Sequence, residues 1–370
     1  MEGSSWEDQL DWVLRHTPLT QRALSGFPAA PEAELFMAFH IDLKMIPVIQ
    51  GMARRISLKV LPCNAATVDR EGWAELARTP GVELIDYAEA FTRLSYPAEG
   101  PRWICDLGGE LICHALAVRG SAVAALEGTT TGLSRIKGRL DGALPGFPVV
   151  DWNSAPLKLA VHNEKMVGFS LWQTFSEVTR LSLHGKQVGV LGFGSVGRGI
   201  ARTARHLGGT VSVYDPSGSA RTLASFEGFA CPTREELLLH SEVLVTATGR
   251  PSALTGGDLG RLRSGAFLLN AGHGSEELAP ELREHALRRT VLRHVEELTL
   301  EGGRHCYLLA RGELLNLGAG FGDTINGFDL TSAQLVQAVR YLLEDGPALA
   351  CDWHILPAEV MDDVLSPGEP

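Results

Sequence analysis

The feature that most constrains this chain is a glycine-rich loop at residues 192–197, with the sequence G-F-G-S-V-G. It lies between an apolar run at 187–191, which predicts a strand, and a helical apolar periodicity at 196–207. Glycines at such a turn allow a tight bend and let the backbone approach a pyrophosphate, which then lies on the helix N-terminus. A second predicted strand, 210–214, ends at Asp215, whose carboxylate can accept both ribose hydroxyls of NAD and would repel a 2′-phosphate.

This setting favours a Rossmann-type NAD domain over a glycine-rich turn without a ligand. The residues that we expect to bind the cofactor through this motif are Gly192, Gly194, Ser195, Val196, Gly197 and Asp215.

Length and composition narrow the possible partners. With 370 residues the chain is long enough for about two domains. Its net charge of −11 argues against a nucleic-acid partner, because phosphate binding needs a basic surface. No apolar run reaches the roughly 18 residues of a membrane span, and the first residues lack the basic and apolar regions of a signal peptide. We therefore expect a cytoplasmic protein with no membrane partner.

Six cysteines are spread along the chain without a C-x-x-C pair. In a chain of this size they predict reduced, mostly buried thiols rather than a disulfide framework or a zinc site. No metal site is expected.

The rest of the chain predicts two α/β domains with parallel sheets. In the first part, strands are predicted at 38–40, 57–61, 82–85, 103–106 and 122–127, and in the second at 243–247, 266–270 and 306–310. A connector at 142–156 and a helix at 167–183 join the two parts, and a further helix is predicted at 330–343. Polar groups follow the strand ends of the first part, where ligands bind in open α/β sheets; they are His40, Asp42, Asn64, Asp106 and the run 127–132.

Several short blocks, taken together, resemble one family. The blocks are H-I-D at 40–42, C-N at 63–64, E-G-T-T-T-G at 127–132, T-A-T-G at 246–249, N-A-G-H at 270–273 and L-L-N-L-G-A at 314–319. With the glycine loop, they resemble the S-adenosylhomocysteine hydrolase family over about residues 35–358. The resemblance implies a discontinuous substrate domain at 1–152 and 327–358 and an NAD domain at 168–322. It also implies hinges at 153–167 and 323–328, and a short tail at 359–370.

The resemblance implies a reaction as well. In the family, a hydride passes from the 3′ carbon of a nucleoside to tightly held NAD, and the resulting ketone acidifies the C4′ proton. A base removes that proton, the 5′ substituent leaves, the resulting enone is hydrated, and NADH reduces the ketone back. Lys158 matches the lysine that helps remove the 3′-hydroxyl proton, which requires burial or a nearby cation to release its own proton. His40 matches the histidine that handles the proton of the leaving group. The alternatives are a solvated surface lysine and a buried structural histidine.

Further roles are carried over in the same way. Residues matching NAD contacts are Thr129, Thr130, Thr131, Asn163, Thr248 and Asn316. Expected substrate contacts are Asn64, Thr67, Lys44, Gly128, His273 and Asp323. The expected catalytic residues are His40, Lys158 and His162, with Asp106 or Asp42 as a candidate base for the C4′ proton.

The departures from the family pattern lie mainly on the substrate side. Leu107 stands where the family has its catalytic carboxylate, and Gly128 replaces a glutamate that holds ribose hydroxyls. We expect these changes to leave an apolar wall and to open volume near the sugar. Three other positions differ too. His162 replaces an aspartate, Lys44 replaces an acid or amide at the adenine edge, and Asp323 replaces a histidine. Two residues are also inserted after Asn163. The chain also stops soon after residue 357, so we expect the family's Lys/Tyr-bearing tail to be missing.

Three functions remain open at this point. The first is an NAD-dependent nucleoside dehydratase of natural-product biosynthesis, which eliminates a 5′-type group, water above all, and keeps the double bond. The second is a divergent S-adenosylhomocysteine hydrolase, and the third a non-catalytic NAD-binding regulatory homologue. A 2-hydroxyacid dehydrogenase would also join a second domain to such a loop, but the L-N-L-G and T-A-T-G blocks do not belong there. We expect a small-molecule nucleoside substrate and a homodimer or homotetramer.

Overall fold

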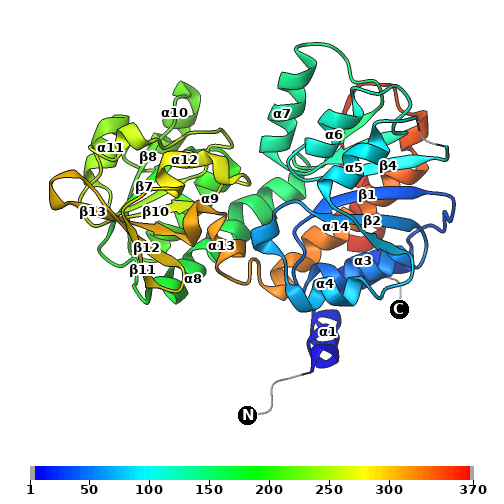
Figure 1. The fold of residues 1–370 in the computed structure, drawn as a ribbon, viewed down its shortest axis with the longest axis horizontal. Coiled ribbons are helices and arrows are strands. Elements are labelled where there is room, and N and C mark those ends of the chain that lie inside the picture. Colours follow the sequence, from blue (N-terminus) through cyan, green and yellow to red (C-terminus); the bar gives the residue numbers. More distant parts are fainter. Residues whose placement is uncertain (1–4, 98, 367–370) are drawn as a thin grey trace. The chain divides into compact units, whose positions relative to one another are not determined.

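The computed structural model describes residues 5–97 and 99–366, and the chain divides into two compact units (Figure 1). The first, which we call the split unit, contains the residues up to 159 and those from 325 onward. The second, the continuous unit, is residues 160–324. Each unit contains one seven-stranded sheet. Within the described ranges, no helix has both the length and the apolar content needed to cross a membrane.

The sheet of the split unit is parallel throughout, with strand order β14-β6-β5-β4-β1-β2-β3. Its strands are β1 Glu34–Phe39, β2 Ser57–Pro62, β3 Val82–Leu84, β4 Arg102–Asp106, β5 Ala124–Glu127, β6 Val149–Asp151 and β14 Trp353–Ile355. Its longer helices are α1 Trp6–Arg15, α2 Pro18–Ser25, α3 Met45–Ala53, α4 Arg70–Leu76, α5 Tyr87–Leu94, α6 Glu110–Ala115, α7 Thr130–Leu140 and α14 Ile325–Glu344.

The two faces of this sheet are covered by different helices because strand residues alternate between faces. Leu35 and Met37 of β1 belong to one apolar core with α3 and α14. Phe36 and Ala38, their neighbours in sequence, belong to another core with α5, α6 and α7. Burial on both faces is typical of a parallel sheet. Because the strands run in the same direction, the carboxyl ends of β1, β2, β4 and β5 lie along one edge.

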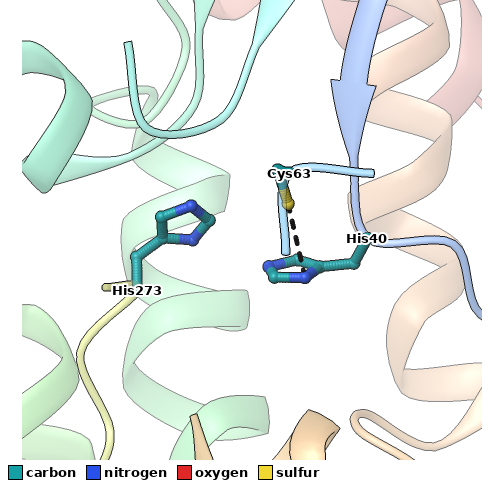
Figure 2. Close-up of side chains that lie close together, drawn as sticks. All are labelled: His40, Cys63 and His273. Carbon is teal, nitrogen blue, oxygen red and sulfur yellow. Dashed lines mark hydrogen bonds between the residues drawn. The ribbon is translucent and has the colours of Figure 1, made fainter. Parts of the chain in front are cut away.

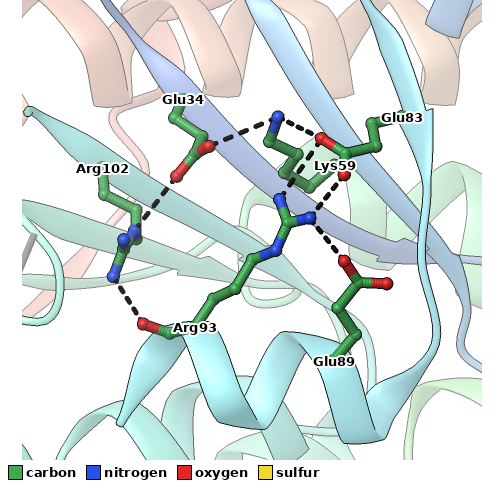
Figure 3. A network of polar contacts seen from close by, with 6 residues as sticks. All are labelled: Glu34, Lys59, Glu83, Glu89, Arg93 and Arg102. Carbon is green, nitrogen blue, oxygen red and sulfur yellow. Dashed lines mark hydrogen bonds and ion pairs between the residues drawn. The ribbon is translucent and has the colours of Figure 1, made fainter. Parts of the chain in front are cut away.

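At the opposite ends of these strands, a network of charged side chains joins β1, β2, β3, β4 and α5 (Figure 3). Lys59 Nζ lies 2.5 Å from Glu83 Oε2 and 3.4 Å from Glu34 Oε1. Arg102 Nε lies 3.2 Å from Glu34 Oε2, and Arg93 pairs with both Glu83 and Glu89. The Arg93 and Lys59 side chains lower the pKa of Glu83 to about 2. Since Glu83 is 43% exposed, solvent screens these pairs and limits what they add to stability.

The continuous unit has strand order β11-β12-β13-β10-β9-β7-β8. Its strands are β7 Gln187–Leu191, β8 Thr210–Tyr214, β9 Val243–Thr246, β10 Ala266–Asn270, β11 Arg288–Leu292, β12 Val295–Thr299 and β13 His305–Leu309. The helices are α8 Val167–Thr179, α9 Ser195–His206, α10 Gly218–Phe226, α11 Arg234–His240, α12 Pro280–Arg283 and α13 Leu315–Gly318. Strands β7, β8, β9, β10 and β13 are parallel, as expected for a Rossmann-type domain.

Several sequence-based predictions need correction. The sheet of the continuous unit is not wholly parallel, because β12 pairs antiparallel with both β11 and β13. The predicted connector 142–156 contains β6, and the helix predicted over 167–183 ends at Thr179, where Arg180 adopts a left-handed backbone with φ +60°. In the tail, α15 Asp362–Leu365 follows a short turn, and Met361 and Val364 are buried. Residues 367–370 of the tail lie outside the described residues.

Candidate cofactor site and candidate catalytic residues

The glycine loop of the continuous unit has the geometry that a dinucleotide needs. Gly192 follows β7 with φ +99°, a conformation that favours glycine, and a Cβ there would lie 2.4 Å from the Ala247 carbonyl oxygen. A Cβ on Gly197 would lie 2.0 Å from the Gly192 carbonyl oxygen. Because both positions exclude a side chain, the loop can close tightly and direct the N-terminus of α9 towards an anion.

Asp215 lies where the ribose-binding acid is expected, one residue after β8. Its Oδ2 accepts the Phe193 N–H of the glycine loop at 2.8 Å, and its Oδ1 accepts the Ser217 N–H at 2.8 Å. The two bonds fix the carboxylate beside the loop while each oxygen keeps further acceptor capacity for ribose hydroxyls. Loop, helix N-terminus and acid therefore fit NAD.

The other predicted cofactor residues of this unit are held by neighbouring side chains. Asn163 Nδ2 donates to Ser195 Oγ at 3.3 Å, and Asn316 Nδ2 donates to Ser170 Oγ at 3.1 Å. Thr248 is fixed by Glu277, which sequence reasoning missed: its carboxylate accepts the Thr248 and Gly249 amides and the Thr248 hydroxyl. Burial raises the pKa of Glu277, and these donors offset part of that rise. An acid closely following N-A-G-H was the signal that could have pointed to it.

Two departures from the family pattern form one pair. His162 Nδ1 lies 2.8 Å from Asp323 Oδ2, and the Asp323 side chain is only 4% exposed. Ser170 Oγ donates to Asp323 Oδ1 at 3.2 Å. His162, which replaces an aspartate of the family pattern, therefore contacts Asp323, which replaces a histidine of that pattern. His273 follows β10 in the same unit.

In the split unit, His40 follows β1 and contacts the loop after β2 (Figure 2). Its Nδ1 lies 2.8 Å from Thr67 Oγ1 and 3.4 Å from Cys63 Sγ. The Thr67 hydroxyl donates to the Asn64 carbonyl oxygen at 2.8 Å, because a carbonyl oxygen can only accept. Both contacts of Thr67 are satisfied together only if His40 donates from Nδ1, so Nε2 of the neutral ring is the acceptor nitrogen. Burial, with the Asp106 carboxylate, raises the pKa of Cys63 well above its usual range, so it is a thiol.

Asp42 and Lys44 pair with each other. Asp42 Oδ1 accepts the amides of Lys44 and Met45 at 3.0 and 3.1 Å, and its Oδ2 lies 2.7 Å from Lys44 Nζ. These contacts give Asp42 a structural role at the start of α3 and argue against it as the base for the C4′ proton. Asn64 Oδ1 likewise accepts the Ala66 amide at 2.8 Å and caps a turn that includes Thr67.

A second candidate base, Asp106, is part of a buried acid pair. Asp106 and Glu127 are register partners at the ends of β4 and β5, and both are fully buried. Asp106 Oδ2 accepts the Leu111 and Ile112 amides, and Glu127 Oε1 accepts from Gly108 and from Thr129. Burial raises the pKa of both carboxyl groups, and for Glu127 the Asp106 charge adds to the rise. These contacts argue for a structural role for Asp106 too.

The threonine run begins α7 directly after this pair. Thr129 Oγ1 donates to Glu127 Oε1 at 2.6 Å and accepts the Gly132 amide at 2.9 Å, which makes Thr129 the N-cap of the helix. Thr130 accepts from Asn153 Nδ2 at 3.2 Å, and Thr131 lies in the first turn.

The expectation that Gly128 opens volume near the sugar is wrong. A Cβ on Gly128 would lie 2.5 Å from Trp152 Nε1 and 2.7 Å from Leu107 Cδ2, so these two side chains fill the space. Lys158 is 7% exposed, with Nζ 5.1 Å from the centre of the Trp152 ring. Lys158 is therefore not a solvated surface lysine, and Trp152 joins three positions singled out by the sequence. Trp152 was missed because a tryptophan after an apolar run indicates core packing.

Known proteins resemble the chain over nearly its whole length. Residues 166–322 match the family model for the S-adenosyl-L-homocysteine hydrolase NAD binding domain. An adenosylhomocysteinase of Thermotoga maritima is 30% identical over 97% of this chain and 92% of its own, and one of Pyrococcus abyssi is 32% identical over 95% and 87%. An S-inosyl-L-homocysteine hydrolase of Methanopyrus kandleri is 28% identical over 95% and 87%.

The likeness to solved structures supports the fold alone. The crystal structure of a dipicolinate synthase from Bacillus halodurans gives a TM-score of 0.50 at 13% identity, covering 85% of this chain and 100% of that one. Family membership is established by the sequence comparisons, which agree with the glycine loop and with Asp215. The chain belongs to the S-adenosyl-L-homocysteine hydrolase family and is an NAD-dependent enzyme of that kind.

Proposed function

We propose that this enzyme is a nucleoside dehydratase that oxidises a sugar hydroxyl transiently, eliminates water from the 5′ position and restores the hydroxyl. Bound NAD supplies the reversible hydride acceptor of the cycle. Net chemistry is then the loss of one water, with no net oxidation and a product that keeps the new double bond. The C3′ hydride leaves and returns, the C4′ proton is removed, and the 5′ hydroxyl departs with one added proton.

Two side chains of the split unit are assigned to proton transfers. Lys158 Nζ takes the proton of the hydroxyl that is oxidised, a task that requires a lysine withdrawn from solvent. Its 7% exposure supports this assignment. Because Nδ1 donates to Thr67, Nε2 is the nitrogen that exchanges the proton: the imidazolium form of His40 gives its Nε2 proton to the leaving hydroxyl and returns to the neutral ring. His162, which pairs with Asp323, is assigned to a sugar hydroxyl because the family resemblance implies that role for its position.

The observation that carries the proposal is the apolar surface around Lys158. Two carboxylates of the family pattern are missing here, at Leu107 and Gly128, and the Trp152 indole and the Leu107 side chain occupy the space beside Gly128. A hydrolase must add water back across the double bond after elimination. Without carboxylates at positions 107 and 128, neither position can hold or activate a water for that addition, so the cycle would end at the unsaturated nucleoside.

Product analysis tests the proposal. The holoenzyme is incubated with a panel of nucleosides that carry a free 5′-type hydroxyl, and products are analysed by mass spectrometry and NMR. We expect one substrate to lose one water and to gain an exocyclic double bond, with NAD unchanged at the end. Lys158→Met should abolish the reaction while NAD binding is retained. Turnover by this variant, or no dehydrated product from any nucleoside, would contradict the proposal.

A divergent hydrolase is the second candidate. It is favoured by the 27–32% identity to relatives that are named adenosylhomocysteinase or S-inosyl-L-homocysteine hydrolase. Release of homocysteine from S-adenosylhomocysteine or S-inosylhomocysteine would establish it. NAD that stays bound but is never reduced by any nucleoside would instead favour a non-catalytic homologue. The homo-oligomer remains an expectation, which light scattering would test.

A further inference from the structure

Trp152 lies in the middle of the residues that distinguish this chain. It follows β6 and is 2% exposed. Its Nε1 would contact a Cβ on Gly128, Leu107 Cδ2 approaches the same point, and Lys158 Nζ lies over its ring. According to the family pattern, these three neighbours occupy the positions of a catalytic carboxylate, a ribose-binding glutamate and the lysine at the reacting hydroxyl.

The indole N–H of Trp152 is buried, and within residues 5–97 and 99–366 no hydrogen-bond acceptor reaches it. Two other buried tryptophans do have acceptors: Trp103 Nε1 donates to the Leu342 carbonyl at 3.1 Å, and Trp172 Nε1 donates to the Ile200 carbonyl at 3.0 Å. A buried donor without an acceptor is unfavourable, and native proteins leave few of them. Its place beside Gly128 and Lys158 points to an acceptor that arrives with a ligand.

We propose that Trp152 determines sugar specificity by donating a hydrogen bond from Nε1 to the sugar hydroxyl that is not oxidised. This inference rests on the proposed nucleoside substrate. Lys158 handles the reacting hydroxyl, and the indole beside it reaches the neighbouring oxygen. The family's glutamate accepts hydrogen bonds from hydroxyls, whereas an indole N–H only donates. The sugar oxygen must therefore act as an acceptor here, and the enzyme selects sugars that carry an oxygen at this place.

The proposal predicts a specific loss in Trp152→Phe, which removes the N–H and keeps an aromatic ring. With the best nucleoside found, we expect kcat/KM to fall about tenfold, the size of one hydrogen bond. The analogue that lacks the non-reacting sugar hydroxyl supplies the second arm. Wild type should prefer the hydroxylated sugar, and Trp152→Phe should lose about tenfold of that preference, because the donor that reads the oxygen is gone.

Trp103→Phe is the matched control. It also removes an indole N–H in the split unit, but this N–H already donates to an acceptor within the protein. It should lower the thermal midpoint of the ligand-free chain more than Trp152→Phe does, and it should leave the sugar preference unchanged. Two results would overturn the inference alone: an unchanged sugar preference in Trp152→Phe, or a thermal loss as large as that of Trp103→Phe, which would mean that the N–H is satisfied inside the protein. If wild type turns over no nucleoside, the proposed function fails and this inference fails with it.

Discussion

At the scale of single residues, the tautomer of the neutral His40 ring follows from its contact with Thr67. Thr67 gives its hydrogen to the Asn64 carbonyl and accepts from His40 Nδ1. The hydroxyl thereby fixes which ring nitrogen carries the proton in the neutral form. Thr67 is a positioning residue, and His40 Nε2 is the atom that we assign to the leaving group.

The variant Thr67→Val tests this arrangement, since it keeps the shape of the side chain and removes the hydroxyl. We expect kcat to fall about tenfold, because the ring loses the acceptor that selects its tautomer. The pH profile of kcat should shift as well, which loss of packing alone would not cause. Thr67→Ser should restore both. A pH profile of Thr67→Val that matches wild type would contradict the role.

Two contacts between distant residues could not be predicted from the sequence. The absence of a glutamate at Gly128 is visible in the sequence, but the side chain that fills its space is 24 positions away, at Trp152. His162 and Asp323 were two separate departures until the structure placed them 2.8 Å apart. Such contacts depend on tertiary packing, which residue spacing within one segment does not encode.

At the scale of elements, the strand–loop–helix from β7 to α9 is held by the close approach of its backbone. Gly197→Ala would place a Cβ 2.0 Å from the Gly192 carbonyl oxygen. We expect the free energy of unfolding to fall by about 1–3 kcal/mol, because the overpacked loop must shift. We also expect weaker NAD binding. Gly194→Ala is the control: its φ is −71° and an added Cβ meets nothing within 4 Å. Thermal melts of the NAD-free chain would compare them, and equal losses would contradict the packing argument.

The acid pair at the ends of β4 and β5 predicts a pH dependence of stability. Burial raises the pKa of Asp106 from 3.8 to about 7. Between these values the folded chain holds a proton that the unfolded chain has released, so stability falls as pH rises through this window. Asp106→Asn removes one of the two buried acids, so the urea midpoint should fall less across this window than in wild type, while the raised pKa of Glu127 keeps part of the fall. Asp345→Asn, which changes an exposed acid of the same unit, should leave the pH dependence of the urea midpoint as in wild type. Parallel curves for wild type and Asp106→Asn would exclude Asp106 as a cause.

Elements with a clear periodic pattern were predicted well, and weakly patterned ones were missed. Strands β8 and β10 have the predicted bounds, 210–214 and 266–270. Strand β6 has three residues and lies in a segment rich in proline and glycine, so no period could emerge. Strand β11 is exposed along its whole length, and an exposed edge needs no alternation of apolar residues.

At the scale of the whole molecule, the chain keeps the cofactor-binding residues of the family pattern but differs from it at several substrate-side positions. The glycine loop and Asp215 keep the geometry that NAD requires. In the split unit, two expected carboxylates are absent and Asp106 and Asp42 are held by structural contacts. We therefore propose that the chain keeps the internal redox cycle of the family and applies it to a different nucleoside.

The most direct test of this account is proton exchange at C4′. Holoenzyme and a nucleoside substrate are mixed in D₂O, NADH absorbance is followed by stopped flow, and the recovered substrate is analysed by NMR. We expect a transient rise in NADH that decays without net reduction, and deuterium at C4′ of the recovered nucleoside. Dehydrated product formed with neither transient NADH nor C4′ exchange would contradict it.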